Sequence, residues 1–262
     1  MKKILRAAVI FSTCTLLWNN VANAQEAQPD PTFAAIDAYL CKYRDGKGSD
    51  DLMKVAEKWN KWMDTNSSAP YSAWIMHPVL SSVNMPVDVV WLGVWQNGKE
   101  MGKGMQDWAD KGGDLNKEFI DVIDCGEHSQ AASVNIRPPV EGWPGKQGVA
   151  AFSNCTLGEG KTVQDSMAVH RAWSAHLDSI GSKTGVWAFF PGAGQNNPEW
   201  DYKIVSSYPD YIAYGADWDN FTNGQGWRKA MEMGSGSVVS CDSPRVYHSV
   251  TVRDANINPA PK

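Results

Sequence analysis

The alternation of hydrophobic and polar positions predicts two sets of elements that follow one another in the same order. Apolar residues at helical spacing, among them Leu52, Val55 and Trp59, mark an amphipathic helix after the first strand. The first set is strand 35–43, helix 49–64, strands 71–77 and 87–95, a helical region 99–123 broken at Gly112 and Gly113, and strand 129–136. The second set is strand 149–154, a helix with Met167, Trp173, Leu177 and Ile180 on its inner face, strands 185–190 and 201–208, a helical region 226–233, and strand 245–252. Each set therefore has the order β-α-β-β-α-β.

The two sets also match residue by residue. Cys41 and Trp59 recur as Cys155 and Trp173, both 114 positions later, and about a dozen such matches follow in order with nearly the same offset. This spacing predicts an internal duplication. The predicted organisation is a segment 25–34, repeat 35–137, a Pro/Gly-rich linker 138–148, repeat 149–253 and a flexible tail 254–262.

The N-terminus has the three parts of a secretory signal. Lys2 and Lys3 form a basic start, 7–18 is a short apolar core, and Ala22–Ala24 is a small-x-small cleavage site. The apolar core is shorter than the roughly twenty residues that span a bilayer, and no later stretch is longer. Residues 1–24 are therefore predicted to be removed on export, which places the protein in the periplasm or outside the cell.

Composition and charge narrow the function classes. The chain has 262 residues, 43% of them hydrophobic and 20% charged, which is typical of a folded globular protein. Loss of 1–24 removes three basic residues and no acidic one, so the formal net charge changes from −5 to −8. Because phosphate contacts require a basic face, nucleic acid is excluded as a partner.

The doubled β-α-β-β-α-β order resembles the dimeric α/β-barrel superfamily, in which two ferredoxin-like domains set their sheets face to face. The fold class expected from this resemblance is α+β, with tandem ferredoxin-like repeats that form an intramolecular dimeric α/β barrel. The resemblance implies a small, often aromatic ligand in the barrel interior. Its members include cofactor-free oxygenases, lactone isomerases, haem peroxidases, haem degraders and non-enzymatic stress proteins, so the fold does not decide the function. Since one chain supplies both sheets, a monomer is expected.

Four cysteines remain after the signal, and an even number in an exported chain suggests two disulfides. Four cysteines allow three pairings. In the order that the resemblance implies, the first and fourth strands of each repeat are antiparallel neighbours. The resemblance therefore predicts the disulfides Cys41–Cys125 and Cys155–Cys241.

The five histidines form no HxH or HxxxH pair, so neither a metal nor any other cofactor is predicted. His248 alternates with Val246 and Val250 on the apolar face of the last strand, and His77 aligns with the apolar Phe190 of the second repeat. Each histidine has two interpretations: a hydrogen-bonded core residue, or a pocket acid/base.

Aromatic residues gather on the matching strands of both repeats. Trp91 and Trp95 share one face of their strand, and Tyr202 and Tyr208 lie on the corresponding strand of the second repeat. They form either core packing or a wall that binds a planar ligand.

With no acid/base pair at convincing spacing, the favoured function is an exported small-molecule binding protein with a hydrophobic or aromatic ligand in the barrel interior. The alternative is a cofactor-independent isomerase, lyase or oxygenase that uses a pocket His or Tyr, with His77 and His248 as the catalytic candidates.

Overall fold

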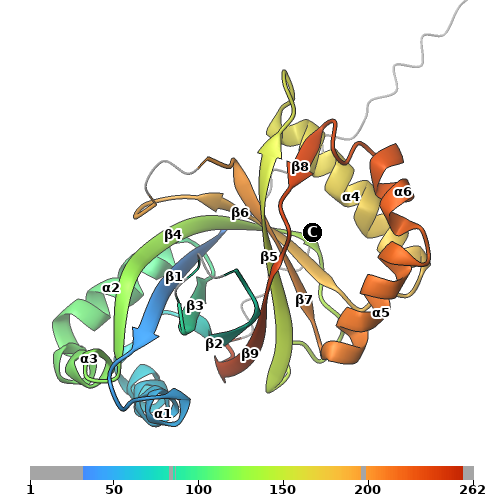
Figure 1. The fold of residues 1–262 in the computed structure, drawn as a ribbon. Coiled ribbons are helices and arrows are strands. Elements are labelled where there is room, and N and C mark those ends of the chain that lie inside the picture. The colour runs from blue at the N-terminus through green and yellow to red at the C-terminus, as the bar shows by residue number, and fades with distance from the viewer. Residues whose placement is uncertain (1–31, 83–84, 86, 196–198, 256–262) are drawn as a thin grey trace, which may run out of the picture. The chain divides into compact units, whose positions relative to one another are not determined.

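The computed structural model describes residues 32–82, 85, 87–195 and 199–255, all within the unit Pro31–Lys262 (Figure 1). The predicted signal peptide 1–24 lies outside the described residues, as do most of the segment 25–34 and most of the tail 254–262. No helix in the described ranges is long and apolar enough to cross a membrane.

The elements follow the order predicted from the sequence, with two additions. The first half contains β1 (Ala34–Tyr43), α1 (Ser49–Asn66), β2 (Tyr71–Leu80), β3 (Val89–Trp95), α2 (Gly98–Lys111), α3 (Gly113–Ile120) and β4 (Ile123–Arg137). The second half contains β5 (Gln147–Leu157), α4 (Val163–Ser179), β6 (Gly185–Pro191), β7 (Tyr202–Tyr208), α5 (Tyr211–Thr222), α6 (Gly226–Glu232), β8 (Val239–Cys241) and β9 (Arg245–Arg253). Helix α5 and strand β8 were not predicted. Helix α5 has no buried residue, so it lacks the apolar stripe by which helices are recognised.

The predicted fold class is wrong in its arrangement of the sheets. The sequence predicts tandem ferredoxin-like repeats whose two sheets pack face to face. Instead, β4 pairs with β6 and β2 pairs with β9, so strands of the two halves join edge to edge. The pair β5–β7 lies within the second half and completes the ring. Eight strands thus form one closed antiparallel barrel in the order β7-β6-β4-β1-β3-β2-β9-β5, with the short β8 attached to β5 and six helices outside (Figure 1). Closure gives hydrogen-bond partners to strands that would otherwise be sheet edges.

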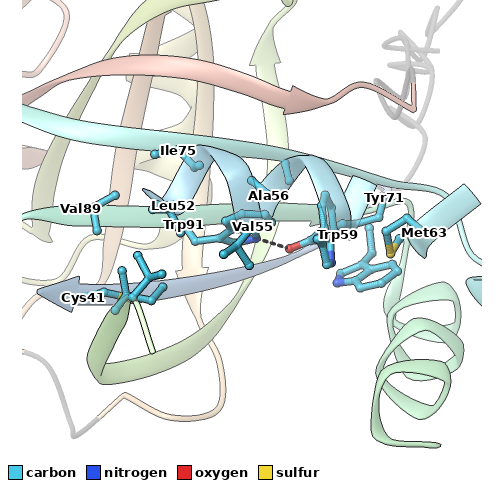
Figure 2. Packing of buried hydrophobic residues seen from close by; sticks show 14 of the residues in the cluster. Cys41, Leu52, Val55, Ala56, Trp59, Met63, Tyr71, Ile75, Val89 and Trp91 are labelled. Carbon is cyan, nitrogen blue, oxygen red and sulfur yellow. Dashed lines mark hydrogen bonds between the residues drawn. The ribbon is translucent and has the colours of Figure 1, made fainter. Parts of the chain in front are cut away.

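Helices cover the outer face of the barrel. In the first half, α1 packs its predicted stripe onto the strands, and Leu52, Val55, Trp59 and Met63 are all buried (Figure 2). The ring of Trp59 meets that of Trp91 edge-on at 4.8 Å. In the second half the stripe is less complete, because Ile180 lies just beyond the end of α4 and is 38% exposed.

The inner face of the barrel carries a second apolar cluster. Its side chains come from strands of both halves and alternate with the outward-facing ones, as the pleat requires. On β3, for example, Val90 and Leu92 point inward and Trp91 points outward. The strands are therefore buried on both faces.

Both predicted disulfides are present. Cys41 lies opposite Cys125 on the β1–β4 pair, and Cys155 lies opposite Cys241 on the β5–β8 pair. The bonds Cys41–Cys125 and Cys155–Cys241 close separations of 84 and 86 residues. Two disulfides are consistent with a protein that folds in an oxidising compartment outside the cytoplasm.

Candidate functional site

The barrel encloses a cavity of about 730 Å³ that opens at one end. Residues of all eight barrel strands contribute to its wall, which is apolar in the middle of the barrel and polar toward the mouth. One group of polar lining residues lies on β4, at 127–130, and another lies where β5, β7 and β9 are side by side (Figure 1). An apolar cavity with a few convergent polar groups is the usual form of a small-molecule site.

Three side chains at this mouth form one hydrogen-bonded group, which we call the mouth triad: Asn154, Lys203 and Arg245. Asn154 on β5 lies directly opposite Lys203 on β7. Its Oδ1 accepts hydrogen bonds from Lys203 Nζ at 2.6 Å and from Arg245 Nη2 at 3.0 Å. One amide oxygen thus holds two cationic side chains together.

Arg245 is fixed from a second direction. Its Nη1 pairs with Asp242 Oδ2 at 2.6 Å, and Asp242 Oδ1 accepts a hydrogen bond from the backbone N–H of Asn154. The guanidinium group is therefore positioned before any ligand arrives, which lowers the ordering cost of binding an anion.

Lys203 has an unusual electrostatic environment. Burial, and secondarily the positive charge of Arg245, lower the pKa of Lys203 from 10.5 to about 8, while Asp242 and Glu127 oppose the shift. The Nζ atom lies 4.0 Å from the ring centre of Trp200, a cation–π contact that favours the charged form. Near pH 8 the amine thus exists in comparable amounts as ammonium and as free base.

Tyr247 forms the wall next to the mouth triad. It follows Arg245 by two positions on β9, so both side chains face the interior. Its hydroxyl donates to Met85 Sδ at 3.9 Å, and burial raises the pKa of Tyr247 above 10.0. The hydroxyl is therefore a neutral donor that can turn toward a ligand.

Of the site residues predicted from the sequence, the structure brings His77 and His248 together. They lie directly opposite each other on β2 and β9, on the helix-facing side of the barrel. Tyr43 Oη lies 3.0 Å from His77 Nε2, and Tyr211 stacks on His248 with ring centres 6.1 Å apart. Burial, and then the charge of His248, lower the pKa of His77. Their role as catalytic residues stays a prediction.

The four predicted aromatic residues also face the helices rather than the larger cavity. Trp91 and Trp95 pack in the core beneath α1, and Trp95 lies 4.1 Å from Tyr71 between ring centres. Tyr202 Oη lies 2.7 Å from His170 Nε2 under α4. Tyr208 packs edge-on against Tyr214 at 5.3 Å, and it also borders a smaller cavity at the other end of the barrel.

Sequence reasoning did not identify the mouth triad. One signal was available: Lys203 stands in alternation with Val205 and Ser207, so a cation shares the face of a buried valine. Such a lysine needs a compensating environment. The pattern did not reveal that this face is the barrel interior, because both faces of β7 are covered.

The superfamily resemblance includes haem proteins, and two described histidines, His128 and His170, already contact other side chains. His128 borders the larger cavity with its ring stacked on Tyr39, at 3.7 Å between centres. His170 is hydrogen-bonded to Tyr202 within a packed core. His170 also lies within 4.8 Å of the sulfurs of Cys155 and Cys241, but these form a disulfide and offer no thiolate ligand.

Comparison with solved structures identifies the fold. A candidate monooxygenase from Lactobacillus acidophilus NCFM matches with a TM-score of 0.51 at 11% identity, covering 86% of this chain and 95% of the other. An anthrone oxidase-like protein matches with a TM-score of 0.51 at 10% identity, covering 87% and 97%. A candidate monooxygenase from Fusobacterium nucleatum matches with a TM-score of 0.55 at 8% identity, covering 85% and 94%. The chain shares its fold with these proteins, which confirms the resemblance noted from the sequence. No family model and no curated protein sequence matches it.

Proposed function

We propose that the protein is a cofactor-independent oxygenase that acts, in the larger cavity of the barrel, on a hydrophobic phenol or enol whose keto form has an acidic CH₂ group. The observation that carries this proposal is the mouth triad, in which a lysine able to act as a base lies beside a fixed arginine. Proteins with the same fold and TM-scores above 0.5 are named as candidate monooxygenases and an anthrone oxidase-like protein, which supports the same class of reaction.

The binding-protein function favoured by the sequence is therefore corrected. That interpretation depended on the lack of an acid/base pair at convincing spacing. The mouth triad joins residues 49 and 91 positions apart, which no local motif can show. The named fold neighbours point to an enzyme as well.

The proposed reaction begins with proton removal. The free-base form of Lys203 takes a proton from an acidic C–H of the substrate, and the resulting carbanion is delocalised into an oxygen that Arg245 stabilises. The carbanion reduces O₂, a C–O bond forms, and the proton held by Lys203 returns to the peroxide. Loss of water then converts the CH₂ group to a carbonyl. The balance is R₂CH₂ + O₂ → R₂C=O + H₂O, with O₂ taking up four electrons.

The test uses 1,8-dihydroxyanthrone as the probe, with O₂ uptake and anthraquinone absorbance as readouts. We expect the protein to accelerate the reaction, and the rate to rise with pH around a midpoint near 8 because the base must be unprotonated. Lys203→Arg keeps the charge but removes the base, so turnover should fall by about 10²-fold or more while binding persists. Lys229→Met, which changes an exposed lysine on α6, is the matched control.

Two results would overturn the proposal. One is a folded wild-type protein that accelerates O₂ uptake with neither the anthrone nor a panel of enolic phenols. The other is a Lys203→Arg variant that turns over as fast as the Lys229→Met control.

We also propose a periplasmic location. The two disulfides support it, together with the predicted signal at 1–24. Fractionation of the native host, with the mature N-terminus determined by mass spectrometry, tests both; a mature chain that begins at Gln25 is expected.

A further inference from the structure

A second, smaller cavity lies at the opposite end of the barrel interior. Its volume is about 90 Å³ and its wall is mostly apolar. Trp143, from the connection between β4 and β5, stacks against Trp74 at 5.6 Å and against Trp187 at 5.2 Å between ring centres. Three tryptophans thus cluster at this end of the barrel, and we call them the tryptophan cap.

The two cavities share part of their walls. Five side chains border both, and all five are apolar: Ile36, Met76, Leu92, Phe152 and Phe189. They come from five different strands, so they encircle the middle of the barrel as a waist. Met76 is unbranched and flexible, which suits a position that must let a ligand pass.

The chemistry changes along this axis. The mouth triad places two cationic side chains at one end, whereas the wall that the described residues form around the smaller cavity at the other end carries no charged side chain and is mostly apolar, with Ser, Thr, Asn and Gln side chains among the aromatic ones. On β1, Leu40 borders the larger cavity and Ala34 the smaller one. Six residues at about 3.3 Å each, on a strand tilted by about 35–45°, span about 15 Å along the barrel axis.

The size of the smaller cavity limits what enters it. An apolar cavity of about 150 Å³ holds a benzene ring, and this cavity is only about 90 Å³. It has room for the end of an alkyl chain but not for a second ring. The larger cavity, at about 730 Å³, accommodates the ring system and the charged group.

We propose that the ligand of this barrel is an aromatic or enolic anion with a short alkyl chain, with the anion at Lys203 and Arg245 and the chain in the cavity beneath the tryptophan cap. This inference rests on the proposed function for the larger cavity as the reaction site. It adds the alkyl chain and its direction, which that function does not require.

The experiment measures binding of 4-alkylbenzoates from methyl to octyl by calorimetry. These acids have no C–H that the proposed reaction can use, so binding is observed without turnover. We expect the affinity to rise about fourfold per methylene, the value for a fully buried CH₂, and to stop rising before the octyl compound. An affinity independent of chain length would overturn the proposal.

Two variants change the cavity in opposite directions. Trp143→Ala enlarges it and should move the plateau to longer chains, so that the octyl compound binds more tightly than to wild type. Ser249→Leu, on the wall of the same cavity, should move the plateau to shorter chains. A gain in affinity cannot come from misfolding, and a Trp143→Ala variant with an unchanged plateau contradicts the inference.

Lys203→Met should weaken binding of all members of the series equally, because every member carries the same carboxylate. If the anthrone is not oxidised but this pattern holds, the oxygenase proposal fails and the ligand inference stands.

Discussion

Replacement of Asp37 by Asn is expected to stabilise the protein at neutral pH. Asp37 is only 6% exposed, in the layer between β1 and the helices of the first half. Its Oδ1 accepts a hydrogen bond of 2.8 Å from Tyr71, whose hydroxyl in turn accepts one of 3.1 Å from Trp91 Nε1. These bonds compensate only part of the cost of burying a charge, so burial raises the pKa of Asp37 from 3.8 to about 6 despite the Tyr71 bond.

The magnitude follows from linkage. Between pH 4 and 6 the native state holds the Asp37 proton more tightly than the unfolded state does, so the free energy of unfolding falls as the pH rises through this window. At 1.36 kcal/mol per pH unit, a rise in pKa from 3.8 to about 6 corresponds to about 3 kcal/mol. Asp37→Asn cannot ionise, so it should match wild type near pH 4 and exceed it by up to about 3 kcal/mol at pH 8.

The assay is urea unfolding followed by tryptophan fluorescence at pH 4, 5, 6, 7 and 8, with the disulfides intact. Asp107→Asn is the matched control, because a backbone hydrogen bond from Ser68 and contacts with Lys111 lower the pKa of the half-buried Asp107. Loss of that carboxylate should remove stability that is present above pH 4, the opposite direction to Asp37→Asn. An Asp37→Asn variant that is less stable than wild type by the same amount at pH 4 and pH 8 would refute the reasoning.

Three further predictions concern stability. Gly93→Ala should destabilise by about 1–3 kcal/mol in chemical unfolding, because the added Cβ would overlap Tyr71 Oη and Asp37 Oδ1. An unchanged unfolding midpoint would show that these two side chains move aside without cost. Replacement of both Cys41 and Cys125 by Ala should cost about 4–5 kcal/mol in the chain-entropy model, and a loss under 1 kcal/mol would contradict that model for this 84-residue separation. Arg137→Met should lower the melting temperature, because the buried guanidinium donates to two backbone carbonyls in the turn before β6, and an unchanged melting temperature would refute that structural role.

The sequence predicts well those parts of the fold that follow from local periodicity. The stripe Leu52, Val55, Trp59 and Met63 is visible because one face of α1 is polar and the other is buried. The disulfide pairing was also predicted correctly, since it depends only on which strands are neighbours within one half. Closure of the barrel was not predictable, because the pairings β2–β9 and β4–β6 join strands of different halves and no short-range pattern encodes them.

The candidate site was missed for a related reason. Strand β3 reads as a continuous apolar run because helices cover its outer face and the opposite wall of the barrel covers its inner face. Alternation then identifies which residues share a face but not which face borders a cavity. Trp91 and Trp95 therefore have the pattern of a ligand-binding wall and lie in the core beneath α1.

The cost of keeping Lys203 in the barrel argues that it has a function. Desolvation lowers its pKa to about 8, and a methionine at this position would fill similar space with no charge to bury. Asn154 and Trp200 offset part of that cost, through a hydrogen bond and a cation–π contact. In the same barrel, Ala150, Val205 and Phe189 show that apolar residues suit several other inward positions. Titratable groups with strongly shifted pKa values are concentrated at functional sites. The mouth triad contains such a group and lies at the mouth of a cavity, which argues for a functional role.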